Sequence, residues 1–183
     1  TELQEHLNTT GSHVAFMPND GPQTDFLAAA EKDVLYGGAA GGGKSFAMLI
    51  DPLRYCHITA HRALILRRSM PELRELIDKS RELYPKAFPG AKFKEAYSWI
   101  GFDEITHLPT EFGWNYLASR LRTTDPALPT FLRCTANPGG VGAQWVKKRY
   151  VEPAAQNKSF VGGDGLSRKF IPARLQDNPF LAE

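Results

Sequence analysis

The sequence predicts a single α/β domain in which a mostly parallel β-sheet carries helices on both faces. Short apolar runs alternate along the chain with segments whose apolar residues recur at helical spacing, the pattern of strands and crossover helices around a parallel sheet. Glycine-rich or acidic segments follow several of the apolar runs, at the strand ends where such sheets bind ligands. The 183 residues, 42% of them hydrophobic, suffice for one core of this kind and are too few for two comfortable domains.

Each element follows from a local pattern. Residues 34–38 form the first expected strand, and residues 44–55 an apolar helix that Pro52 bends or ends. Residues 62–67, RALILR, are typical of a buried parallel strand. The later expected elements are a helix that starts at 70–71 and stops before Pro85, a loop over 85–96, a strand at 98–102, a helix around 111–122, a strand around 130–135, a short basic helix at 143–150 and a strand at 169–171.

The stretch 34–45, VLYGGAAGGGKS, places an apolar strand directly before a glycine-rich turn that ends in Lys-Ser. It satisfies the phosphate-loop pattern G-x-x-x-x-G-K-S/T, and the strand before and helix after it favour this interpretation over a plain glycine turn. Glycines bring successive N–H groups close to phosphate oxygens, the lysine binds the β- and γ-phosphates, and the serine hydroxyl is a ligand for Mg²⁺. The residues expected to bind ATP are Gly38, Ala39, Ala40, Gly41, Gly42, Gly43, Lys44 and Ser45.

A second segment, which is acidic, is expected to supply the other half of the nucleotide site. The apolar run SWIGF leads straight into Asp103 and Glu104. Beside a phosphate loop, Asp103 is expected to hold Mg²⁺ with Ser45, and Glu104 to orient and deprotonate an attacking water. An Asp-Glu pair alone is more often solvated surface. In this context it predicts a Mg²⁺-dependent ATPase, a P-loop NTPase of the additional-strand, catalytic-glutamate type.

The segments GGAAGGGKS, WIGFDE and TANPGG, with GPQTDFL before the first strand and FIPARLQDNPFLAE at the end, resemble the ATPase domain of the large terminase subunit of tailed bacteriophages. The resemblance covers nearly the whole chain after about Asp20. It implies a motor that uses ATP to move double-stranded viral DNA into a procapsid in the host cell cytoplasm. It also implies three protein partners, namely further copies in a ring, a portal protein, and a small terminase subunit that selects the DNA.

Two residue roles are implied by the same resemblance. Asn137 matches the coupling motif, in which it senses the γ-phosphate and passes hydrolysis on to the DNA grip. Gln23 matches the adenine-binding position, although a surface turn is an equally weighted alternative.

The chain also departs from the family pattern. Ala40 stands where many members carry an arginine, so the isolated domain is expected to be a poor ATPase that needs an arginine from a neighbouring subunit. Residues are expected to be missing between Glu95 and Trp99, where members carry a further strand-bearing stretch. The family's C-terminal nuclease domain has no counterpart before Glu183, and the chain is therefore expected not to cut DNA.

The charge balance limits how DNA can be bound. Lys and Arg number 22 against 20 Asp and Glu, a net charge of +2, so any DNA contact must come from a local patch. The candidate patch is Lys147, Lys148 and Arg149, although three cations on a short helix are more often a solvated face. Candidates for contacts to phosphate or to a neighbouring subunit, against ordinary ion pairing, are Arg67, Arg68, Arg120 and Arg122.

The remaining residue types point away from other classes. No apolar run approaches the roughly 20 residues of a membrane span, and no membrane contact is expected. Cys56 and Cys134 are predicted to be reduced core thiols, and His57 and His61 lack a convincing metal-binding pattern. His107 is expected either near the chemistry or in a plain loop. Trp99, Trp114 and Trp145 are predicted to pack in or beside the core.

Two other function classes stay open beside a DNA-translocating ATPase. A small-molecule P-loop kinase needs an arginine-rich lid and a substrate pocket, and Glu104 beside Asp103 favours water over such a substrate as nucleophile. A nucleotide-gated structural module without turnover is the third possibility.

Overall fold

The computed structural model describes residues 16–39, 41, 43–87, 97–123 and 125–177. Within these residues the strands form one six-stranded sheet in the order β2-β3-β4-β1-β6-β5. Every neighbouring pair is parallel except β5 with β6, which is antiparallel. The strands are β1 (Asp33–Gly38), β2 (Ala63–Leu66), β3 (Trp99–Phe102), β4 (Phe131–Ala136), β5 (Ser159–Val161) and β6 (Ser167–Ala173). The predicted fold class, a mostly parallel α/β sheet, is confirmed.

Strand β4 lies between the strand that leads into the phosphate loop and the strand that leads into the acidic pair. It pairs with β1 on one side, with Leu35 opposite Cys134, and with β3 on the other, with Phe102 also opposite Cys134. Strand β4, inserted between β1 and β3, is therefore the additional strand of the predicted fold type. The carboxyl ends of β1, β4, β3 and β2 therefore follow one another along a single edge of the sheet, so the residues that follow these strands converge there.

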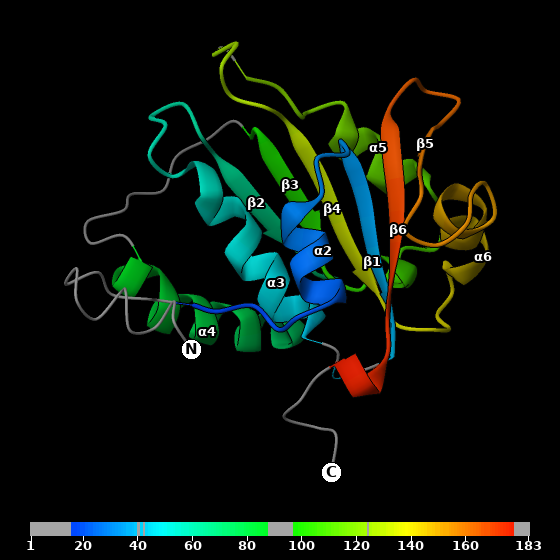
Figure 1. The fold of residues 1–183 in the computed structure, drawn as a ribbon, viewed down its shortest axis with the longest axis horizontal. Coiled ribbons are helices and arrows are strands. Elements are labelled where there is room, and N and C mark those ends of the chain that lie inside the picture. The colour runs from blue at the N-terminus through cyan, green and yellow to red at the C-terminus, as the bar shows by residue number, and fades with distance from the viewer. Residues whose placement is uncertain (1–15, 40, 42, 88–96, 124, 178–183) are drawn as a thin grey trace.

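Helices cover both faces of the sheet, as predicted, with α2, α3 and α4 on one face and α5 and α6 on the other (Figure 1). Phe26 of α2 and Ala47 of α3 pack against Val34, Tyr36 and Ile171. Trp114, Val146 and Tyr150 pack against the opposite face. The helices are α2 (Pro22–Ala28), α3 (Lys44–Ile50) with a 3-10 turn (Asp51–Tyr55), α4 (Met70–Ala87), α5 (Phe112–Ala118) and α6 (Ala143–Val146) with a π-helical turn (Lys147–Val151). No helix in the described part of the chain combines the length and the apolar character needed to cross a bilayer.

Several boundaries differ from the predictions for physical reasons. Strand β2 is not buried, because among the described residues it is the edge strand and pairs with β3 alone, and its side chains are half-buried or exposed. Helix α4 runs through Pro85 to Ala87, and the prediction that this proline lies beyond the helix is wrong. Strand β5 was not predicted, since three residues held by a hairpin to β6 give no periodic signal. The suspected gap between Glu95 and Trp99 starts at Glu95 and Ala96, which lie outside the described residues.

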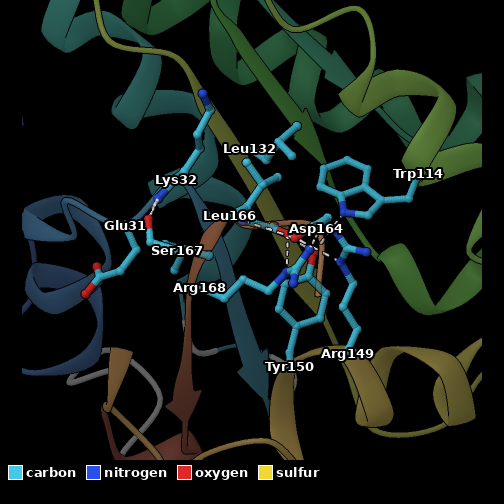
Figure 2. Close-up of polar contacts among 12 residues, drawn as sticks. Glu31, Lys32, Trp114, Leu132, Arg149, Tyr150, Asp164, Leu166, Ser167 and Arg168 are labelled. Carbon is cyan, nitrogen blue, oxygen red and sulfur yellow. Dashed lines mark hydrogen bonds and ion pairs between the residues drawn. The ribbon is translucent and has the colours of Figure 1, made fainter. Parts of the chain in front are cut away.

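A buried ionic network fastens the start of β1 to the β5–β6 hairpin and to the π-helical turn that follows α6 (Figure 2). Asp33, fully buried, accepts hydrogen bonds from the Tyr150 hydroxyl at 2.7 Å, Arg168 Nε at 2.9 Å and Arg149 Nη2 at 3.0 Å. Asp164, in the turn between β5 and β6, pairs with both arginines. Because each buried charge has several partners, the network holds the amino end of β1, α6 and the hairpin in one arrangement.

Candidate active site

The loop predicted to bind phosphate, called the phosphate loop below, joins β1 to α3, and glycine is required at both of its ends. Gly38 has a φ of 137°, and a Cβ there would lie 1.9 Å from the carbonyl oxygen of Ala173 in β6. Gly43, just before α3, has a φ of 73°, and a Cβ there would lie 2.7 Å from the Gln23 amide nitrogen. Ala40 and Gly42 lie outside the described residues. The neighbouring elements thus confine the loop backbone tightly at its entry and exit.

Lys44 is buried at the start of α3 and folds back over the loop. Its ammonium donates to the carbonyl oxygens of Ala39 at 2.5 Å and Gly38 at 3.3 Å. Burial lowers the pKa of Lys44 from its ordinary value, and the nearby carboxylates of Glu104 and Asp103 raise it in part. The ammonium is therefore a buried cation beside two carboxylates, with its hydrogen bonds directed at the loop itself.

Ser45 and Asp103, the two predicted Mg²⁺ ligands, lie in contact. The Ser45 hydroxyl lies 3.1 Å from both carboxylate oxygens of Asp103, which is fully buried. The Thr135 hydroxyl donates to the same carboxylate, and Arg67 Nε lies 3.3 Å from it. No group of three or more His, Cys, Asp or Glu capable of holding a metal occurs among the described residues. A nucleotide-bound Mg²⁺ needs only one or two protein ligands besides phosphate and water, so this hydroxyl and carboxylate fit it.

Glu104 and Asn137 form a second close pair at the ends of β3 and β4. One Glu104 carboxylate oxygen accepts from Asn137 Nδ2 at 2.6 Å and the other from the Asn137 backbone N–H at 3.1 Å. Glu104 has a φ of 62°, in the left-handed region, and its own N–H donates to the Thr135 hydroxyl at 3.0 Å. Asn137 Oδ1 is buried and has no hydrogen-bond partner among the described residues. That oxygen can accept a hydrogen bond from a water or ligand in the site.

A cleft of about 240 Å³ opens at this edge of the sheet. Its walls bring Arg67, at the end of β2, together with Glu104 and Asn137. The rest of the lining is Thr106, His107, Pro138, Gly139 and Gly140. His107 therefore lies beside the candidate chemistry and not in a remote loop.

Gln23 is buried against the phosphate loop, and the surface-turn alternative is wrong. Its amide nitrogen donates to the Gly43 carbonyl at 3.1 Å, and its amide oxygen accepts from the Asn19 backbone N–H at 2.7 Å. Only 4% of Gln23 is exposed. The residue thus connects the segment before α2 to the loop.

In the candidate DNA patch, one of the three cations is buried and ion-paired. The Arg149 side chain is 6% exposed and pairs with Asp33, Glu111 and Asp164, because the sheet and the hairpin close over it. Lys147 and Lys148 are exposed, and Lys147 pairs with Glu152 at 3.4 Å. Any DNA contact by this helix must come from the two lysines.

Other sequence-based candidates fall away from the cleft. Arg120 contacts the Tyr116 hydroxyl and ring, and Arg122 bonds through its backbone to Tyr97, ahead of β3. Arg68 is exposed beside Arg67. His61 bonds to Ser98 and the Pro52 carbonyl, as a structural residue.

The cysteine and tryptophan predictions come out differently. Cys134 is buried, as predicted, whereas Cys56 is exposed on the turn after α3 and the prediction of a core thiol there is wrong. Trp99 and Trp114 are fully buried and Trp145 is half-buried, as predicted.

Sequence reasoning missed the role of Thr135. Its fully buried hydroxyl lies between Asp103 and the backbone of Glu104 and bonds to both. A hydroxyl residue near the carboxyl end of an apolar strand is the only signal in the sequence, and it has meaning only once β4 is known to neighbour β3.

No protein-family model matches the chain, and no curated protein matches it. Among solved structures, the large terminase from a thermophilic bacteriophage shares the fold with a TM-score of 0.61. The fold is terminase-like. The sequences are 13% identical, and the match covers 88% of this chain and 47% of that terminase chain. The chain thus spans about half the length of the terminase that it matches.

Proposed function

We propose that this domain hydrolyses ATP with Mg²⁺ and uses the energy to move double-stranded viral DNA into a procapsid. One observation carries the ATPase assignment: the phosphate loop meets the acidic pair, with the Ser45 hydroxyl 3.1 Å from both Asp103 carboxylate oxygens and Glu104 next along the chain. The terminase-like fold supports the packaging part of the proposal.

The residues of the site have distinct roles in this proposal. Glu104 accepts a proton from water as the water oxygen bonds to the γ-phosphorus, and the bond from that phosphorus to the bridging oxygen breaks with its electron pair leaving on ADP. Lys44 and the loop N–H groups bind the phosphates. Ser45 and Asp103 would hold Mg²⁺, which would supply charge neutralisation. Asn137, already bonded to Glu104, reports the presence of the γ-phosphate, and Gln23 reads the adenine from beside the loop.

The proposed partners follow from the packaging role. They are double-stranded DNA, a portal protein, a small terminase subunit and further copies of the chain in a ring, within the host cell cytoplasm. The exposed Lys147 and Lys148 are available for DNA phosphates.

An assay of inorganic phosphate release from ATP, with and without double-stranded DNA, tests the proposal. We expect Mg²⁺-dependent release that DNA increases and that Lys44→Ala abolishes. No release by the wild-type protein under either condition would contradict the ATPase assignment. Transfer of the γ-phosphate to a small-molecule acceptor would favour a kinase, and release that is indifferent to DNA would contradict the translocation part.

A further inference from the structure

The phosphate loop carries few positive charges for the phosphates that it is proposed to bind. In GGAAGGGKS the only cation is Lys44. Phosphoryl transfer spreads negative charge over the γ-phosphate oxygens, and P-loop enzymes commonly stabilise it with an arginine in addition to the lysine and the metal. A further cation near Glu104 and Asn137 is therefore of interest wherever it comes from in the chain.

Arg67 is placed at this point by the sheet. It directly follows the last residue of β2, and β2 pairs with β3 up to Leu66 opposite Phe102. Arg67 and Asp103 are thus the next residues on neighbouring strands, and Arg67 Nε lies 3.3 Å from Asp103 Oδ2. The Arg67 side chain is 17% exposed, Asp103 is fully buried, and Arg67 forms one wall of the cleft that Glu104 and Asn137 also line.

Among the arginines of the described residues, Arg67 alone lines this cleft, and several others are clearly engaged elsewhere. Arg68 is exposed, Arg120 is held on Tyr116 near the amino end of β3, and Arg149 and Arg168 are locked in the Asp33 network. Arg174 follows β6 close to the loop but is exposed and outside the cleft lining. Position, burial and the shared cleft therefore single out Arg67.

We propose that Arg67 is a nucleotide-sensing cation of the same chain, which balances the charge of Asp103 in the free protein and contacts the γ-phosphoryl group when a triphosphate is bound. The inference rests on the proposed ATPase function. Mg²⁺ and Arg67 are both attracted to Asp103, so a metal at that carboxylate reduces the need for the ion pair. The γ-phosphate then offers the guanidinium a new anionic partner, and planar guanidinium groups match phosphate oxygens well. Since ADP lacks the γ-phosphate, Arg67 discriminates the two nucleotides.

Equilibrium binding of fluorescent ADP and of a fluorescent non-hydrolysable ATP analogue, each with Mg²⁺, tests this without relying on turnover. Arg67→Gln is expected to weaken binding of the triphosphate about 10-fold or more, as for loss of a hydrogen bond to a charged group, and to change ADP binding less than about 3-fold. Arg67→Lys is expected to show a smaller selective loss, because lysine keeps the charge without the planar fork. Arg68→Gln, the adjacent exposed arginine, is the matched control and should bind both nucleotides like the wild type.

The possible outcomes separate this inference from the proposed function. A wild-type protein that binds neither nucleotide contradicts the proposed function itself. If the wild type binds both, an unchanged ratio of the two affinities in Arg67→Gln overturns the inference, and so does an equal loss for both nucleotides, which indicates a structural role only. A selective loss in Arg174→Gln with none in Arg67→Gln assigns the role to Arg174 and also overturns the inference. If urea unfolding shows that Arg67→Gln does not fold, Arg67→Lys decides, and the absence of any selective loss there contradicts the inference.

Discussion

At the scale of single residues, Glu104→Gln tests the proposed role of Glu104 as the base separately from nucleotide binding. Glu104→Gln keeps the size of the side chain and an oxygen acceptor for Asn137, but an amide cannot take a proton from water. We expect nucleotide affinity near that of the wild type and a loss of hydrolysis of about 100-fold or more, measured by phosphate release. Glu152→Gln, at an exposed ion pair with Lys147, should leave the rate unchanged. Near-normal turnover by Glu104→Gln would remove Glu104 as the base.

Asn137 is expected to affect coupling more than binding. Asn137→Ala removes the 2.6 Å hydrogen bond to Glu104 and the amide that is proposed to report the γ-phosphate. We expect ATP and ADP to bind with similar affinity and most of the DNA stimulation of hydrolysis to disappear. Gln144→Ala, an exposed amide on α6, is the control. Undiminished stimulation by DNA in Asn137→Ala would exclude Asn137 from the coupling step.

How far the sequence predicts the site depends on whether its residues are local in the chain. Lys44 and Ser45 are predictable because the phosphate loop is contiguous and each residue type has a fixed role at a fixed spacing. The contacts of Arg67 and Thr135 with Asp103 depend on which strands are neighbours, and neighbouring strands cannot be read from a single sequence. The burial of Arg149 escaped prediction for the same reason, since its partner Asp33 lies 116 positions away.

At the scale of elements, the fixation of β1 to the hairpin depends on Asp33. Asp33→Ala leaves Arg149, Arg168 and the Tyr150 hydroxyl without their shared acceptor. Breaking a buried ion pair from one side typically costs about 3–5 kcal/mol, and we expect a loss of this size in the free energy of unfolding, measured with urea. Asp78→Ala removes an exposed carboxylate 3.8 Å from Arg81 and should cost less than about 1 kcal/mol. Equal effects of the two substitutions would mean that the network contributes little.

The same hairpin should make the free energy of unfolding depend on pH in the acid range. Burial raises the pKa of Asp164. The Leu166 N–H, Arg168 and Arg149 together lower this pKa by a larger amount, so the net shift is downward from the ordinary value of 3.8. A carboxylate with a lowered folded-state pKa contributes stability above its unfolded-state pKa and loses that contribution as the pH falls through the lower folded-state value. Wild type and Asp164→Asn should therefore differ in urea midpoint at pH 6 and converge as the pH falls through the lowered folded-state pKa of Asp164. A constant difference over that range would contradict this assignment.

Element prediction succeeded where one strand or helix was long enough to show its own period. The runs before the phosphate loop and before Asp103 were found because they are apolar and end abruptly. Strand β2 was expected to be buried because its four apolar residues resemble a central strand, whereas its exposure comes from its position at the edge.

At the scale of the whole molecule, Arg120 and Arg122 are the candidates for an arginine supplied to the site of a neighbouring copy. Leu121 bridges Tyr97 ahead of β3, at the opposite end of the strand from Asp103. Head-to-tail contacts join two different surfaces of neighbouring subunits, and we expect this surface to face the next subunit of a ring. We expect hydrolysis per molecule to rise with protein concentration, because an arginine supplied by a neighbour is typically worth about 10³–10⁵ in rate.

Mixing two inactive variants checks the ring hypothesis. Lys44→Ala has a dead site and intact arginines, and the double variant Arg120→Gln with Arg122→Gln has the reverse. Their mixture should recover turnover that neither shows alone. High activity that is flat over a wide dilution series, with no recovery on mixing, would mean that one chain completes its own site. Arg67 is tested by binding to a single chain, so the two hypotheses can be decided independently.

At position 104, the left-handed backbone favours one set of residues for stability, whereas the proposed chemistry requires another. A residue other than glycine or asparagine in that conformation costs about 1–2 kcal/mol, and Glu104 has a φ of 62°. A library randomised at position 104 and selected only for resistance to proteolysis should therefore enrich Gly and Asn over Ala, and lose the carboxylate. Selection for turnover should restore glutamate alone. Selection for activity would then keep the proposed base at position 104, although substitutions to Gly or Asn there would make the folded protein more stable.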